Sequence, residues 1–211
     1  NPAGVIKSDV RQSEANVQFE FTPNRKTIGY GVERTDVDSP YSRFFVNFSY
    51  GLKGVFNSDF AYEKIQLLYK QPIIIGPLGR SNIIVETGKT FGTIPLGLMS
   101  VIPGNQTYFT IENTFSNLNF YEFITDQYTT LQWNHDFGGR LFARIPMMRK
   151  LNWREFIGIK GVYGTISDAN RAINASNQPY NAPENVYWEY NAGIGNIFKV
   201  FRIDFSWRGS Y

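Results

Sequence analysis

The segment 201–208 alternates strictly between large apolar side chains and polar or charged ones. A repeat of two residues predicts a β-strand, in which successive side chains point to opposite faces. A buried strand of a soluble protein rarely carries three charges on one face, whereas a strand between lipid and a polar interior does so naturally. We therefore expect a lipid-facing row of Phe201, Ile203, Phe205 and Trp207, and a polar row of Arg202, Asp204, Ser206 and Arg208.

Seven earlier segments show the same alternation less regularly, at 17–22, 44–50, 64–70, 83–88, 131–137, 157–163 and 187–194. Most of these strands would be about 8–12 residues long, and roughly 9–11 residues cross a bilayer at a tilt. No apolar run approaches the roughly 20 residues of a membrane helix. The pattern predicts an all-β fold, namely an antiparallel transmembrane β-barrel of about eight strands or the C-terminal part of a larger barrel.

The expected domain organisation has two parts, a polar lead-in or plug-like segment at 1–15 and a β-barrel domain at 16–211. The chain begins at Asn1 without an apolar leader, which fits either a removed signal peptide or a piece of a longer protein.

The connections between the predicted strands give a second signal. From residue 60 onward they alternate, with 71–80 and 196–200 short, 138–152 intermediate, and 91–125 and 165–185 long. Outer-membrane barrels combine short periplasmic turns with long external loops in this way. The earlier connections, 23–41 and 51–59, do not follow the alternation.

The composition excludes several kinds of site. The chain has no cysteine, so disulfides, zinc–thiolate sites and thiol catalysis are ruled out, and a single histidine rules out a multi-histidine metal site. The formal net charge is only +3 and no basic run is present, so we expect no nucleic-acid partner. We also expect no cofactor.

Three motifs allow both a functional and a structural interpretation. His135 could act as a general base, but no serine lies in a G-x-S-x-G context, so we favour a residue near the barrel rim. Asp36 and Asp38 could chelate calcium, but the EF-hand glycine and glutamate are missing, which favours a solvated turn. The glycines of 158–164 resemble part of a phosphate loop, but glycines in a strand more often let neighbouring strands approach closely. We expect no catalytic centre.

Charged residues on the predicted inward faces have mixed signs. This mixture predicts ion pairs within the lumen rather than a strongly ion-selective pore. The inward-facing set is Lys64, Lys70, Glu86, Asp136, Lys160, Glu189, Arg202, Asp204 and Arg208.

A separate basic cluster lies in the connection 138–152 and at its edge. It could contact anionic headgroups or a periplasmic partner, or it could be a solvated turn whose cations anchor the membrane interface, and the sequence leaves both open. The cluster consists of Arg140, Arg144, Arg149, Lys150 and Arg154.

Several stretches carry a resemblance, namely 104–106, 117–137, 145–155 and 195–208. Together they resemble a family of uncharacterised Bacteroidetes outer-membrane proteins in which a carboxypeptidase-regulatory-like domain precedes a large C-terminal barrel. The resemblance implies that this chain is the C-terminal part of such a barrel. More distantly, the arrangement is similar to surface-antigen barrels of the BamA type, whose long loop folds into the barrel before a strand with acidic partners. The segment 91–125 would be that loop, although it lacks the arginine of the family's loop motif.

The function expected from these patterns is that of an outer-membrane β-barrel protein of a Gram-negative bacterium, with a role in passage, assembly or surface contact. Its partners would be outer-membrane lipids and a periplasmic or membrane protein. One alternative is a membrane-embedded lipid-modifying enzyme, which would need a Ser–His pair with an acidic orienter. Another is a soluble ligand-binding barrel or sandwich, in which a second sheet would cover the row 201–207.

Overall fold

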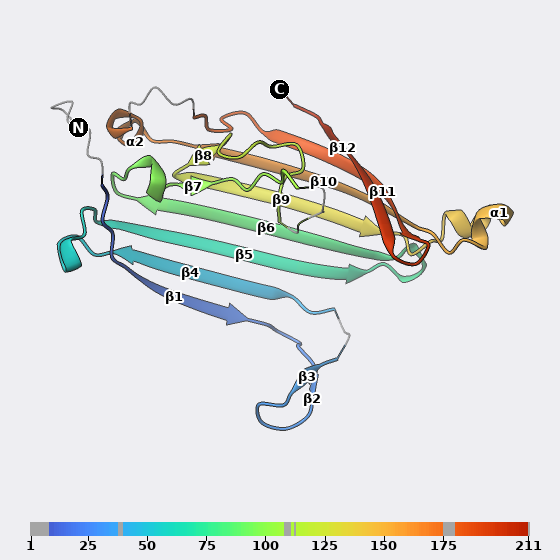
Figure 1. The fold of residues 1–211 in the computed structure, drawn as a ribbon. Helices are drawn as coiled ribbons and strands as arrows, with labels where there is room; N and C mark the ends of the chain where they lie inside the picture. The colour runs from blue at the N-terminus through green and yellow to red at the C-terminus, as the bar shows by residue number, and fades with distance from the viewer. Residues whose placement is uncertain (1–8, 38–39, 108–110, 112, 175–179, 211) are drawn as a thin grey trace.

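The computed structural model describes residues 9–37, 40–107, 111, 113–174 and 180–210. Its main feature is one antiparallel sheet of eight strands in the order β1-β4-β5-β6-β9-β10-β11-β12 (Figure 1). These strands are β1 (Glu14–Phe21), β4 (Arg43–Gly51), β5 (Tyr62–Ile74), β6 (Arg80–Phe91), β9 (Gln127–Asp136), β10 (Arg154–Thr165), β11 (Tyr187–Ile197) and β12 (Phe201–Arg208).

Smaller elements lie in the connections. Two small antiparallel sheets pair β2 (Thr27–Ile28) with β3 (Thr35–Asp36), and β7 (Ser100–Val101) with β8 (Ile124–Thr125). The helical turns are η1 (Val55–Asn57), η2 (Gly76–Leu78), η3 (Leu96–Leu98), η4 (Phe142–Arg144), α1 (Pro146–Arg149) and α2 (Asp168–Ile173). Within the described residues, no helix has the length and apolar character needed to cross a membrane.

The predicted all-β fold and antiparallel arrangement are confirmed, and each of the eight predicted strands is present. β1 begins at Glu14, just before the predicted start of the barrel domain, and β5 and β6 run further into their shared turn than expected. The large sheet is open: among the described residues, β1 pairs only with β4 and β12 only with β11.

The strand register keeps each row of side chains on one face across the whole sheet. Phe19 lies opposite Val46, Val46 opposite Leu67, and Leu67 opposite Thr87. Directly opposite residues in an antiparallel pair point to the same side of the sheet. The apolar side chains of neighbouring strands therefore gather on one face, and the polar side chains gather on the other. One face of the sheet is therefore largely apolar and the other largely polar.

The apolar face is the exposed one. The side chains of Phe201, Ile203, Phe205 and Trp207 are 62, 50, 57 and 45% exposed, and no second sheet covers this row among the described residues. The apolar residues of β1 and β4 are likewise exposed. A soluble sheet places its apolar face against a core, so this arrangement is the reverse of the usual one.

The buried core lies instead between the polar face and the long connections. One cluster contains Ile102, Phe115, Leu118 and Phe123 from the segment 92–126, packed on side chains of β9, β10 and β11. A second cluster joins the same segment to β5 and to the connection 166–186. Figure 1 shows β7 and β8 lying over the sheet, near the end where the connections 92–126 and 166–186 lie.

The connections are sorted between the two ends of the sheet. The segments 52–61, 92–126 and 166–186 lie at one end, on the left in Figure 1. The shorter turns at 75–79 and 198–200 lie at the other end, together with 137–153 and with 22–42, which contains the β2–β3 hairpin. The alternation expected after residue 60 is therefore present, and 22–42 departs from it as its length indicated.

Candidate functional site

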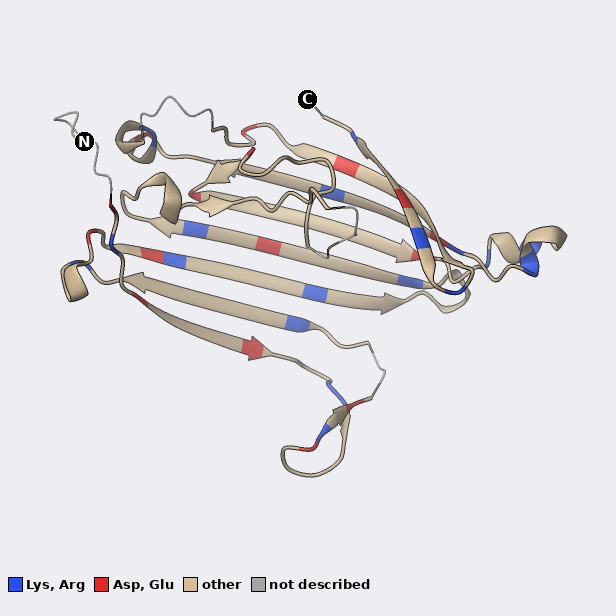
Figure 2. Ribbon diagram, in the orientation of Figure 1, with Lys and Arg blue, Asp and Glu red and all other residues tan. Residues whose placement is uncertain are grey.

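The strand register places the charged residues that the sequence predicted as inward-facing on the polar face of the sheet. Figure 2 shows that charged positions are spread across the strands. The register places Lys160 opposite Glu189 and Glu189 opposite Arg208. The full set is Lys64 and Lys70 on β5, Glu86 on β6, Asp136 on β9, Lys160 on β10, Glu189 on β11, and Arg202, Asp204 and Arg208 on β12.

Two ion pairs on this face join near neighbours. The ammonium nitrogen of Lys160 lies 3.8 Å from Oε1 of Glu189, on the adjacent strand. Arg202 pairs with Asp204, two residues further along β12, with Nε 2.7 Å from Oδ2. These two pairs therefore join neighbouring positions within the sheet.

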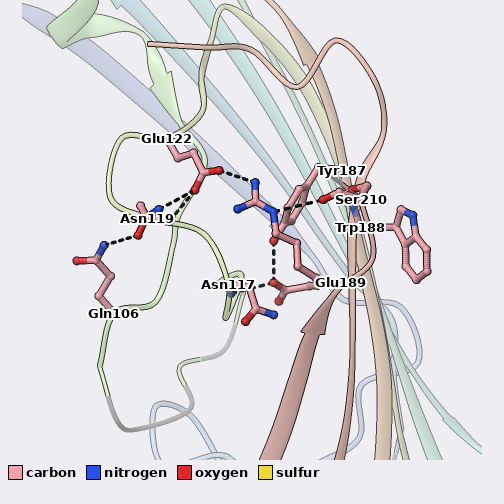
Figure 3. A network of polar contacts seen from close by, with 9 residues as sticks. Gln106, Asn117, Asn119, Glu122, Tyr187, Trp188, Glu189 and Ser210 are labelled. Carbon is pink, nitrogen blue, oxygen red and sulfur yellow. Dashed lines mark hydrogen bonds and ion pairs between the residues drawn. The ribbon is translucent and has the colours of Figure 1, made fainter. Parts of the chain in front are cut away.

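Glu189 anchors the segment 92–126 to the sheet. Its side chain is buried, and Oε1 accepts a hydrogen bond from the backbone N–H of Ser116 at 2.7 Å. Oε2 accepts one from the N–H of Asn117 at 2.9 Å and one from the hydroxyl of Tyr187 at 3.2 Å (Figure 3). Lys160 donates to the carbonyl of Thr114 at 2.7 Å. A buried carboxylate needs such donors, so the charge and the docked backbone depend on each other.

Phe115 fills the space between these polar contacts. It is completely buried, and its ring meets that of Tyr187 edge-on, with centroids 5.8 Å apart and planes at 68°. Its backbone N–H donates to the carbonyl of Pro103 at 2.9 Å, and its carbonyl accepts from the N–H of Asn105 at 2.8 Å. The segment 114–117 is thus docked on the sheet through an apolar side chain and through contacts to charged ones.

A second anchor joins the same segment to the last strand. Glu122 accepts a hydrogen bond from the guanidinium of Arg208 at 2.5 Å and another from the backbone N–H of Asn119 at 2.9 Å. Partial burial opposes ionisation of Glu122, but the Asn119 N–H and the Arg208 charge outweigh it, so the pKa of Glu122 lies below its ordinary value. The guanidinium of Arg208 also lies over the ring of Tyr187, 4.9 Å from its centroid.

A third set of contacts fastens the two long connections to each other. Oδ2 of Asp126 accepts hydrogen bonds from the N–H and hydroxyl of Ser167, at 2.8 and 2.6 Å, and from the amide of Asn170 at 2.8 Å. Asn170 in turn accepts from the N–H of Ile94 at 2.9 Å. The segments 92–126 and 166–186 therefore form one layer over the sheet.

A cavity of about 340 Å³ lies beside the docked segment on the polar face. Its polar lining includes Asn82, Gln132, Asn134, Lys160 and Arg202. Such a space is large enough for water or a small polar group.

His135 does meet a serine. Its Nδ1 lies 2.7 Å from the hydroxyl of Ser81, and its Nε2 lies 2.9 Å from the carbonyl of Leu78, which accepts a hydrogen bond from the Nε2–H tautomer. Ser81 is 3% exposed and also receives a hydrogen bond from the indole of Trp133 at 3.3 Å. The acceptor that orients the imidazole is thus a backbone carbonyl and not a carboxylate.

The glycines of 158–164 and Asp36, the other candidate site residues, have structural roles. The glycines of 158–164 lie inside β10, and a side chain at Gly158 would meet the amide oxygens of Asn191 and Asn134. Asp36 binds Arg25 at 2.6 Å, which holds the pKa of Asp36 below its ordinary value. Asp38 lies outside the described residues. No three His, Asp or Glu side chains gather as metal ligands in the described part of the chain.

Sequence reasoning missed the contacts between the segment 92–126 and the sheet. The sequence showed only that this segment lacks an arginine. The structure places the acid on the loop and the arginine on the strand, so the charges are reversed relative to the arrangement expected from the surface-antigen barrels. Glu122 and Arg208 are distant in the sequence, so only a complementary-charge search could have suggested the pair.

A sequence profile described as the C-terminal domain of a family of unknown function, DUF5686, matches residues 8–169. The match includes the whole of the segment 92–126, whereas β11 and β12, which carry Glu189 and Arg208, lie beyond it. No curated protein and no solved structure matches the chain.

The close approach at Gly104 gives a test of the docked segment. A Cβ at this position would lie 2.3 Å from the carbonyl oxygen of Leu118, so Gly104→Ala forces that backbone apart. We expect the free energy of unfolding, measured with urea in detergent micelles, to fall by about 1–3 kcal/mol. Gly97→Ala is the matched control, because nothing lies within 4 Å of its Cβ position. Equal stability of the two variants would contradict the docking.

The Glu122–Arg208 contact predicts a dependence on pH. A lowered pKa means that this contact stabilises the docked state above the ordinary value of 4.5 and is lost as the pH falls through the folded-state pKa. Because the chain lacks cysteine, a spin label at Phe120→Cys reports loop mobility without further changes. We expect mobility to rise as the pH is lowered from neutral through the folded-state pKa of Glu122, which lies below 4.5.

Glu122→Gln should give the higher mobility already at neutral pH. Glu33→Gln, an exposed acid beside the β2–β3 hairpin, is the matched control and should leave the label unchanged. A label that stays immobile in Glu122→Gln would show that the contact does not hold the loop.

Proposed function

The chain belongs to the DUF5686 family and carries its C-terminal domain, and we propose that this domain forms the wall of an outer-membrane β-barrel with the segment 92–126 folded into the lumen. The single observation that carries the proposal is the exposed apolar face of a sheet whose opposite face is charged and covered. The location in a Gram-negative bacterium, and the Bacteroidetes origin with a preceding carboxypeptidase-regulatory-like domain, are part of this proposal.

The energetics of the two faces support a membrane. Leaving a row of Phe, Ile and Trp in water forfeits about 1.5–3 kcal/mol for each side chain that could be buried. Placing the opposite charged row in a dry core costs several kcal/mol for each unpaired ion. Lipid on one face and a wet lumen on the other avoids both penalties. The soluble sandwich is disfavoured because it needs a cover over 201–207, and these side chains are exposed.

The strand lengths and the sheet edges fit the same environment. β5 has 13 residues, and β6 and β10 have 12 each, which is long enough to cross a bilayer at a tilt. Unpaired edges are not tolerated in hydrocarbon, so we infer that the edges of β1 and β12 are paired in the membrane, with each other or with further strands.

The docked segment favours a role in assembly over open passage. A freely conducting pore needs a clear lumen, whereas here Phe115 and the Glu189 contacts hold a plug against the wall. The nearest expected parallel is the surface-antigen barrel, with a loop fixed to late strands by a charge pair. We propose that the protein handles other outer-membrane components, with outer-membrane lipids and a periplasmic or membrane protein as partners, and that it has no catalytic centre.

The wall is tested by placing a charge on each face of β12. Phe205→Arg puts the charge on the apolar face near the middle of the strand, where it should destabilise a membrane barrel by about 2–4 kcal/mol. The matched control Ser206→Arg puts the same charge on the polar face. We expect only Phe205→Arg to reduce the heat-modifiable folded band after insertion into lipid vesicles. A protein that is fully folded in water without detergent would overturn the proposal.

The Ser81–His135 pair favours a second candidate, a membrane-embedded lipid hydrolase, because it supplies a hydroxyl beside a base. The first candidate is preferred since the hydroxyl is buried and the orienting group is a carbonyl. In the preferred candidate, Ser81→Ala lowers the free energy of unfolding by about 1–3 kcal/mol by leaving His135 Nδ1 unpaired, without changing phospholipid hydrolysis. Loss of a measurable hydrolysis in Ser81→Ala would instead establish the second candidate.

A further inference from the structure

The connection 137–153 has the composition of a membrane-surface segment. It contains η4 and α1 and lies beyond the sheet at the end with the shorter turns, on the right in Figure 1. Its apolar side chains Leu141, Ile145, Met147 and Leu151 are exposed. They alternate with the cations Arg140, Arg144, Arg149 and Lys150, and Figure 2 shows positive charge at α1. Exposed apolar residues among cations are typical of segments that lie in the headgroup region.

The neighbouring turn 198–200 adds to the same surface. Phe198 is 83% exposed and Val200 is also exposed, with Lys199 between them. Asn196 donates a hydrogen bond to the carbonyl of Asn152 at 2.7 Å, which holds the two connections side by side. The apolar surface continues from this turn into Phe201 at the start of β12.

A cleft of about 540 Å³ opens between these two connections. Three cations line it, Arg149, Arg154 and Lys199, together with the aromatic rings of Phe142 and Trp153. No Asp or Glu is among the lining residues. Arg154 lies 3.9 Å from Asp136, whereas neither Arg149 nor Lys199 has an acidic partner among the described residues.

Two contacts hold the walls of the cleft in place. The buried Glu155 accepts a hydrogen bond from the backbone N–H of Phe142 at 2.5 Å, which ties η4 to β10. The rings of Phe142 and Trp153 meet edge-on, with centroids 6.3 Å apart. A preformed cleft binds a ligand without first paying the entropy of ordering its walls.

We propose that this cleft binds the phosphate headgroup of an anionic phospholipid at the periplasmic surface of the membrane, a proposal that rests on the barrel function proposed above. Arg149 and Lys199 supply the unpaired positive charge. Leu141, Met147 and Phe198 enter the boundary of the acyl chains, while the long cationic side chains extend back to the headgroups. Short turns of such barrels face the periplasm, so the inner leaflet supplies the lipid.

The test compares two lipids on the purified full-length protein. Delipidated protein is titrated with phosphatidylglycerol and with phosphatidylcholine, and bound lipid is counted by native mass spectrometry. We expect Arg149→Gln combined with Lys199→Gln to weaken phosphatidylglycerol binding about tenfold or more, from the loss of two cations near the phosphate. Phosphatidylcholine binding should not change.

The matched control removes two exposed lysines from the opposite end of the sheet, with Lys53→Gln and Lys89→Gln. An equal loss in this control, or equal wild-type affinity for both lipids, would overturn the proposal. Displacement of the lipid by soluble glycerol phosphate at similar concentration would assign the cleft to a free anion and also overturn it. Heat-modifiability of each variant verifies that the barrel is folded.

The two proposals fail in different ways. A protein that inserts into vesicles but shows no preference for phosphatidylglycerol rejects only the headgroup site. A protein that stays folded in water and does not insert rejects the barrel function and the headgroup site together.

Discussion

The two-residue alternation of the strands determines most of this structure. It gives the large sheet one apolar and one polar face, and a slip of one residue in any pair would exchange them. Because the apolar face is turned outward, the protein cannot build its core there. The core forms on the polar side instead, where the segment 92–126 brings its own apolar side chains, including Phe115 and Leu118, onto Tyr187 and Val162.

Because the core forms on the polar side of the sheet, the charged side chains there hold the docked segment in place. Glu189 would be costly as a buried ion without donors, and two backbone N–H groups of the docked segment supply them. Conversely, the N–H groups of Ser116 and Asn117 would be unpaired under Phe115 without the carboxylate. The sheet and the segment 92–126 therefore stabilise each other. Without this contact, the Glu189 carboxylate on the sheet and the two N–H groups of the segment would lose these hydrogen bonds.

The strands and their faces could be predicted because a period of two residues is a local signal. The same signal occurs in each neighbouring strand. The rows of β12 and the positions of Lys160 and Glu189 follow from it directly. The anchoring of 114–117 could not be predicted. The side chains of Glu189 and Lys160 bind backbone groups of this segment, and backbone groups have no sequence signature. The Ser81–His135 pair depends on the register between β6 and β9, which the alternation alone does not fix to a particular residue.

The order of the anchors along the chain has a consequence for biogenesis. Each strand of the large sheet pairs with its predecessor, so hairpins can form successively as the polypeptide emerges. The segment 92–126, however, is held by Glu189 and Arg208, which lie on the β11–β12 hairpin and follow the segment in the sequence. Its docked conformation therefore acquires its full set of charged contacts only after β11 and β12 have joined the sheet.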